Sequence, residues 1–121
     1  MKNLYLFLLI TFSTLSTQGQ NQPFITTWEV DASDLSITIP THSGSTYNYT
    51  VDFGDGTVLT NQTGDTTHTY NSAGTYIVSI SGTFPRIYFN NNGINRYKVK
   101  SIDQWGDISW ESMASAFKGC F

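Results

Sequence analysis

The stretch Asp52-Phe53-Gly54-Asp55-Gly56-Thr57 joins the end of an alternating run to a turn rich in glycine and aspartate. Before the turn, the apolar and polar residues alternate strictly: Tyr47, Tyr49, Val51 and Phe53 against Asn48, Thr50 and Asp52. This period of two is typical of a strand with one buried side. Because glycine adopts turn conformations freely and aspartate accepts backbone N–H bonds, the stretch predicts a tight turn that closes the strand.

The same alternation recurs on both sides of this turn. It predicts strands over residues 24–30, 35–39, 47–53, 67–70 and 76–80, with a further short strand beginning at Val58. Residues 61–65 read as a polar loop, and residues 84–102 fit either a hairpin that completes the sheets or a bridge to a second module. Several short strands separated by Gly, Asn, Ser and Pro predict an all-β sandwich.

Three motifs follow one another over roughly residues 24–82: the turn of residues 52–57, then His68-Thr69-Tyr70, then Gly74-Thr75-Tyr76-Ile77-Val78-Ser79-Ile80. Their order resembles the polycystic kidney disease (PKD) domain, an immunoglobulin-like β-sandwich of extracellular proteins. The resemblance implies structural roles for Asp52, Gly54, Asp55, Gly56, His68, Tyr70, Gly74 and Tyr76. It also implies a positive φ at Gly74, in the turn before Tyr76.

Residues 1–20 are predicted to be a signal peptide that precedes the sandwich. Lys2 supplies a positive start, residues 4–15 form an apolar run, and cleavage is expected after Gly19 or Gln20. A membrane anchor is the alternative, but Thr and Ser interrupt a run that is already shorter than the about 20 apolar residues of a spanning helix. The expected location is therefore extracellular, with the mature chain secreted or attached to the cell surface.

Residues 101–121 differ in pattern from the predicted sandwich of residues 21–100. Trp110, Met113 and Phe117 are spaced as on one face of a helix. The segment Ser101-Ile102-Asp103-Gln104-Trp105-Gly106 and the later Ala116-Phe117 and Gly119-Cys120 resemble the opening of a BspA-type leucine-rich repeat. The resemblance implies a short C-terminal helix from a truncated repeat, at the front of a longer surface protein, since stable arrays need about three repeats.

Composition excludes some classes of function. Acidic residues occupy 29–65 without Lys or Arg, and only four basic residues follow in 86–100, so a nucleic-acid-binding surface is not expected. Cys120 is the single cysteine, which rules out an intrachain disulfide. Aromatic residues make up 15% of the chain, which is enough to build a hydrophobic core without disulfide bonds. An exported domain without disulfides mildly favours a bacterial source.

Candidate catalytic groups each have a structural alternative. Asp52 and Asp55 are candidate calcium ligands, the only cofactor suggested, but turn aspartates usually accept backbone N–H bonds. His68 and His42 lack a second histidine at metal-ligand spacing, so a structural hydrogen bond is the better interpretation. Cys120 has no nearby base and reads as a small apolar residue of a core. The sequence thus predicts no catalytic site.

The tyrosines are the remaining candidates for binding. Alternation predicts that Tyr47, Tyr49, Tyr70 and Tyr76 lie mainly in the core, whereas an outward-facing set would suit sugar or protein contacts. The resulting hypothesis is a non-catalytic, monomeric module for spacing and for contact with protein or glycan on host, matrix or neighbouring cells. It would belong to a bacterial adhesin-like leucine-rich-repeat protein. The alternative is an accessory domain of a secreted hydrolase that degrades polysaccharide or protein.

Overall fold

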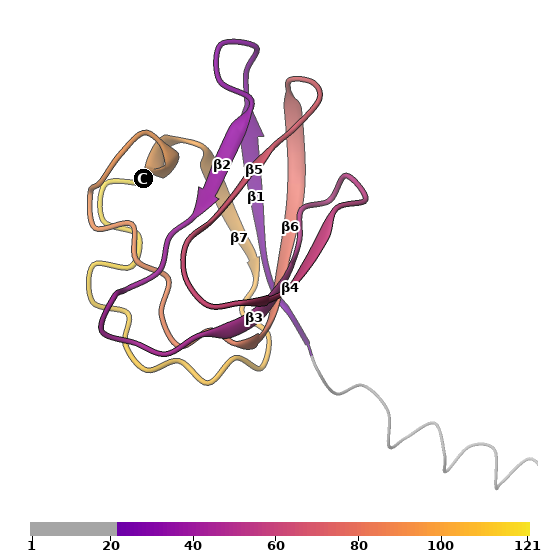
Figure 1. Cartoon of the computed structure of the whole chain (residues 1–121). Helices are drawn as coiled ribbons and strands as arrows, with labels where there is room; N and C mark the ends of the chain where they lie inside the picture. Colours follow the sequence, from indigo (N-terminus) through magenta and orange to yellow (C-terminus); the bar gives the residue numbers. More distant parts are fainter. Residues whose placement is uncertain (1–21) are drawn as a thin grey trace, which may run out of the picture.

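A computed structural model describes residues 22–121 as seven strands and one short 3-10 helix (Figure 1). The elements are β1 Phe24–Val30, β2 Ser36–Ile39, β3 Asn48–Asp52, β4 Val58–Gln62, β5 Thr66–Thr69, β6 Gly74–Thr83, η1 Asn95–Tyr97 and β7 Val99–Gln104. The predicted signal peptide of residues 1–20 lies outside the described residues. Within residues 22–121, no helix has the length and apolar character needed to cross a membrane.

The strands form two antiparallel sheets. The larger has the order β4-β3-β6-β1-β7, and the smaller consists of β2 and β5. Strand β6 is the centre of the larger sheet, pairing with β1 through Val78 opposite Thr26 and with β3 through Ile80 opposite Val51. The all-β prediction is confirmed, and the paired antiparallel sheets are consistent with an immunoglobulin-like sandwich.

Alternation along the strands produces one buried core. In β1 the buried side chains are Phe24, Thr26, Trp28 and Val30, as the period of two predicts. Tyr47, Tyr49 and Tyr70 are buried and Tyr76 packs partly buried against the same core, so the expectation that these tyrosines are mainly core is confirmed. Ile77, on the opposite face of β6, is 55% exposed.

Residues 84–104 belong to the sandwich rather than to a bridge. β7 pairs with β1 at the edge of the larger sheet, with Val99 opposite Trp28 and register shifts along the strand. Phe84, Ile87 and Phe89 are buried in the core although their segment forms no strand. The expected boundary between residues 100 and 101 falls inside β7.

The polar loop predicted at residues 61–65 begins later than expected. Strand β4 continues to Gln62, which pairs with Tyr49. The continuation depends on a register shift between Tyr49 and Val51, and Asn61 has a φ of 56°. A β-bulge of this kind allows the polar end of a strand to stay paired. The polar composition of the segment predicts a loop and gives no sign of this pairing.

The helix expected over Trp110, Met113 and Phe117 is not present. Residues 105–121 form turns, and Ser115 has a φ of 57°, which an α-helix does not accommodate. The carbonyl groups of this segment accept hydrogen bonds from another part of the chain: Phe89 N donates to Ala116 O at 2.8 Å and Asn90 N to Ser115 O at 3.0 Å. Trp110 packs edge-on against Phe24, at 4.9 Å between ring centroids. The spacing of these apolar residues therefore does not mark one face of a helix. They belong to an irregular segment that packs on the sandwich.

Side chains close the free edge of β2. Its Ser36 carbonyl oxygen accepts from Lys98 Nζ at 2.5 Å, and its Thr38 N–H donates to Asn95 Oδ1 at 2.9 Å. Lys98 is buried, and its ammonium also pairs with Asp34 Oδ2 at 2.7 Å. These contacts tie the smaller sheet to η1 and to Lys98, which follows it. They also occupy backbone groups that an exposed strand edge would offer to another chain.

The Lys98–Asp34 pair predicts a pH dependence of stability. The hydrogen bond from Lys98, followed by those from Ser36, lowers the pKa of Asp34 from 3.8 to about 2. Because the folded pKa lies below the unfolded one, the pair stabilises the fold fully above pH 3.8 and loses this effect as the pH falls toward 2. A double-mutant cycle of Asp34→Asn and Lys98→Met, measured by urea unfolding, is expected to give a coupling energy at pH 6 that shrinks at pH 2. Equal coupling at both pH values would contradict the assignment.

Candidate binding groove

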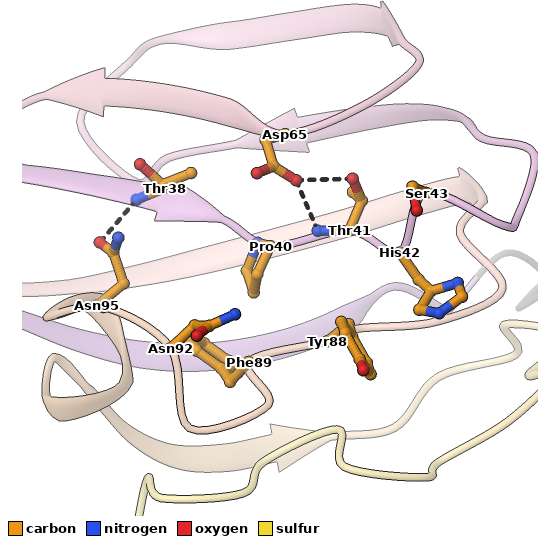
Figure 2. Close-up of a pocket in the computed structure, with 11 residues that line it drawn as sticks. Thr38, Pro40, Thr41, His42, Ser43, Asp65, Tyr88, Phe89, Asn92 and Asn95 are labelled. Carbon is orange, nitrogen blue, oxygen red and sulfur yellow. Dashed lines mark hydrogen bonds between the residues drawn. The ribbon is translucent and has the colours of Figure 1, made fainter.

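An open groove of about 470 Å³ lies where the end of β2 and the segment before η1 face each other. Eleven residues line it: Thr38, Pro40, Thr41, His42, Ser43, Asp65, Tyr88, Phe89, Asn92, Gly93 and Asn95. Figure 2 shows Asp65 and Thr41 on one side, Asn92 and Tyr88 on the other, and Pro40 between them. The volume lies in the range of about 300–1,000 Å³ that small-ligand sites occupy.

Hydrogen bonds fix two of the polar side chains in the groove. Asp65 Oδ1 accepts from Thr41 N at 2.8 Å and from Thr41 Oγ1 at 2.7 Å. Asn95 Oδ1 accepts from Thr38 N at 2.9 Å, which assigns the amide orientation and leaves the NH₂ group free to donate. Both side chains thus have one polar end held and one polar end available (Figure 2).

Tyr88 forms the aromatic part of the wall. Its backbone N donates to Pro40 O at 3.3 Å, which holds the segment against the end of β2. The Arg86 guanidinium lies 4.7 Å from the centre of the Tyr88 ring, and the His42 ring meets it edge-on at 4.6 Å between centroids. The ring is therefore braced, and cation–π attraction adds to its packing.

Other polar atoms of the groove have no partner within residues 22–121. No hydrogen bond there uses the Ser43 hydroxyl, the Tyr88 hydroxyl or the side-chain amide of Asn92. In folded proteins, polar groups without internal partners bind water or a ligand. The groove therefore offers both donors and acceptors to whatever enters it.

The groove holds a serine, a histidine and an aspartate, but they are not arranged as a catalytic triad. His42 Nδ1 accepts from the Gly44 N–H at 3.1 Å, and Asp65 bonds to Thr41 instead of to a histidine. A triad requires a base bonded to the nucleophile and a carboxylate bonded to the base. Asp65 is also the only carboxylate among the lining residues, whereas most glycosidases use two. The arrangement suits binding.

The aspartates singled out from the sequence, Asp52 at the end of β3 and Asp55 in the β3–β4 turn, do not line this groove. Asp52 Oδ1 accepts from Gly54 N at 2.9 Å, and Asp55 Oδ1 accepts from Thr57 N at 3.0 Å. Asp55 Oδ2 pairs with His68 Nε2 at 2.7 Å. Burial alone would raise the pKa of Asp55, but the hydrogen bonds from His68 and Thr57 outweigh it and lower the pKa. Within residues 22–121, no three His, Cys, Asp or Glu side chains gather as metal ligands.

His68 and Tyr70 join the two sheets around Phe53. The His68 ring stacks on Phe53 at 4.5 Å, and the Tyr70 hydroxyl donates to Phe53 O at 2.7 Å. Tyr70 also stacks on Tyr76, with 3.7 Å between ring centroids. Burial raises the pKa of Tyr70, so its hydroxyl remains a donor at all ordinary pH values.

All three glycines singled out from the sequence have a positive φ, but that of Gly74 lies at the margin of the extended region. Gly54 and Gly56 have φ values of 82° and 96°. Gly74, at 159°, is close to extended and begins β6 opposite Val30. An added Cβ on Gly74 would make only ordinary contacts with the Tyr76 ring, at 3.7 Å. Of these three glycines, Gly54 is the one at which an added Cβ would also clash with backbone, at the carbonyl oxygen of Ile77.

Cys120 lies partly buried against the core rather than in the groove. It packs with the hydrophobic cluster, and burial raises the pKa of its thiol, although Arg96 opposes the shift. A thiol with a raised pKa is less nucleophilic at neutral pH. This environment is that of a packing residue.

Comparison with known protein families gives a match to the PKD domain over residues 12–85. Searches of curated proteins and of solved structures found no match. The matched region includes the turn of residues 52–57 and strands β1 to β6, which supply most of the two sheets described above. PKD domains occur in extracellular proteins and are generally non-catalytic binding or accessory modules. The chain therefore belongs to the PKD domain family.

Proposed function

We propose that this chain is a non-catalytic module for spacing and for ligand contact in a secreted or cell-surface bacterial protein. One observation carries the proposal: the groove beside Tyr88 combines fixed polar side chains with free donors and acceptors and lacks a paired catalytic base. A preformed concave site with few oriented polar groups is the usual form of a binding site.

The connection between the start and the end of the sandwich supports a spacing role. Asp107 N donates to Gln22 O at 2.9 Å, and Asp107 Oδ2 accepts from Gln22 N at 3.0 Å. Gln104 Nε2 donates to Pro23 O at 2.9 Å. These contacts hold the segment that enters β1 against the segment that leaves β7, so the direction of one fixes the direction of the other.

The adhesin-like context depends on the likeness of residues 101–121 to a BspA-type repeat. In this proposal the Trp105-Gly106 turn and the aromatic residues after it serve the sandwich and also lead into repeats. Exposed Trp105 and Phe121, at 48% and 78% exposure, supply apolar surface that a following repeat would cover. The hydrolase alternative keeps the same groove, with the module anchoring a substrate for a neighbouring catalytic domain.

A binding screen with the purified protein tests the proposal. The panel contains polysaccharides and extracellular-matrix proteins, and ligand mass is measured before and after incubation. We expect saturable binding to at least one ligand and no change in its mass. Turnover of a ligand, or the absence of saturable binding across the panel, would contradict the proposal.

A further inference from the structure

We infer that the groove lined by Asp65, Tyr88, Asn92 and Asn95 binds an uncharged segment of a carbohydrate chain. The inference rests on the proposed binding function and adds the class of ligand to it. A sugar ring presents hydroxyl groups that both donate and accept hydrogen bonds at its edge, and C–H groups on its faces. The groove offers the matching chemistry on its two sides (Figure 2).

The polar side is set in place before a ligand enters. Two bonds from Thr41 hold Asp65 Oδ1, which leaves Oδ2 as an acceptor for sugar hydroxyls. The Thr38 N–H holds Asn95 Oδ1, which leaves two N–H donors on Asn95. Side chains that are already ordered lose less conformational entropy on binding. The Asn92 amide, exposed and without an internal bond in the described part of the chain, adds a second adaptable donor and acceptor.

The aromatic side suits the apolar face of a sugar. Tyr88 is half-buried and braced by Arg86 and His42, so its ring lies on a firm support. A flat aromatic surface with a hydroxyl at its rim packs against apolar C–H groups and still serves a polar ligand. Pro40, between the two sides, adds a rigid apolar floor.

The charges on the lining favour an uncharged ligand. Asp65 is the only acid among the lining residues, and no Lys or Arg lines the groove. Arg86 lies over Tyr88, and its Nη2 donates to Ala114 O at 2.9 Å. Asp65 would repel the negative charge of a sulfated or sialylated glycan, and no Lys or Arg among the lining residues offsets that repulsion.

The neighbouring strand edge argues against an extended peptide as the ligand. A peptide that adds to a sheet needs free backbone groups on an edge strand. At this groove the edge belongs to β2, where Asn95 occupies the Thr38 N–H and Lys98 occupies the Ser36 carbonyl. The groove therefore presents side chains rather than a backbone ladder.

The site is a property of this chain more than of its family. The family match ends at residue 85, while Tyr88, Asn92 and Asn95 follow it. The segment that carries them is held in place by Phe89, which is buried and donates from its N–H to Ala116 O. One side of the groove thus comes from the matched domain and the other from the segment packed onto it.

A glycan array with neutral, sulfated and sialylated oligosaccharides tests the inference, followed by calorimetric titration of each glycan bound. We expect neutral glycans to bind and Tyr88→Ala to weaken them by about tenfold, the scale of one aromatic contact. Tyr97→Ala is the matched control, because Tyr97 is an exposed tyrosine that also stacks with an arginine but lies outside the groove. Asn92→Ala, which removes no internal bond in the described residues, is a second groove variant that is expected to fold normally.

Three outcomes would overturn the inference. Neutral glycans that bind Tyr88→Ala and Asn92→Ala as well as the wild type would place the site elsewhere, while the proposed binding function would stand. Binding of anionic glycans alone would contradict the ligand class. Binding of a matrix protein that is lost in both variants, with no glycan bound, would make the groove a protein site and leave the proposed function intact.

Discussion

Replacing Gly54 by alanine is expected to lower the free energy of unfolding by more than about 3 kcal/mol, by combining backbone strain with a steric clash. Gly54 follows β3 with a φ of 82°, which costs about 1–2 kcal/mol for a residue with a side chain. A Cβ there would also overlap the carbonyl oxygen of Ile77, a backbone atom of the central strand β6. Because β6 is paired on both sides, it cannot move away without disturbing β1 and β3.

Gly56→Ala separates these two contributions. Gly56 lies in the same turn with a φ of 96°, but an added Cβ would meet no atom within 4 Å. We expect Gly56→Ala to show only the conformational cost of about 1–2 kcal/mol. Urea unfolding of both variants, followed by tryptophan fluorescence, gives the two free energies. Equal losses would mean that β6 yields to the side chain and that the turn is not fixed against it.

Residues with strict alternation made most of the sheet predictable. Phe24, Trp28 and Val51 each lie in a run of period two, and each is buried where the pattern places it. The turn between β3 and β4 could also be predicted from the sequence, because glycine and aspartate have local roles in turns that need no tertiary contact. What could be predicted was thus the part of the structure that short segments determine by themselves.

The tail could not be predicted because its structure depends on contacts distant in sequence. Trp110 and Phe117 have helical spacing, yet Phe89 and Asn90 draw the carbonyls of Ala116 and Ser115 into bonds across the chain. A short segment gains little from forming an isolated helix, so packing on an existing core decides its conformation. Periodicity reports which residues are apolar and does not report which surface they meet.

The groove was hidden for a related reason. Asp65 and Asn95 are 30 positions apart, and each looks like an ordinary polar loop residue. Strand β2 brings them into the same groove. Asp65 bonds to Thr41, which follows β2, and Asn95 bonds to Thr38, which belongs to it. The one local signal was the run from Asn90 to Gly93, which predicts a turn next to an aromatic residue but not its partner across the groove.

Trp28→Ala is the second large effect that the packing predicts, with a loss of about 3–5 kcal/mol in the free energy of unfolding. Trp28 is completely buried in β1, and its ring lies 5.7 Å from that of Phe89 between centroids. The cavity would remove support from the segment that carries Tyr88, so glycan affinity is expected to fall together with stability. Thermal unfolding and glycan titration of the same variant measure both quantities. A stable variant with normal affinity would show that the groove segment does not depend on the core.

Trp28→Phe with Thr26→Val distinguishes lost volume from a lost hydrogen bond. The Trp28 indole N–H donates to Thr26 Oγ1 at 2.8 Å, and both residues are buried. Trp28→Phe alone leaves that hydroxyl without its donor, a cost of about 1–3 kcal/mol beyond the smaller ring. Adding Thr26→Val removes the unpaired group, so the double variant is expected to be more stable than Trp28→Phe alone. If it is less stable instead, the loss in Trp28→Phe does not come from an unpaired Thr26 hydroxyl.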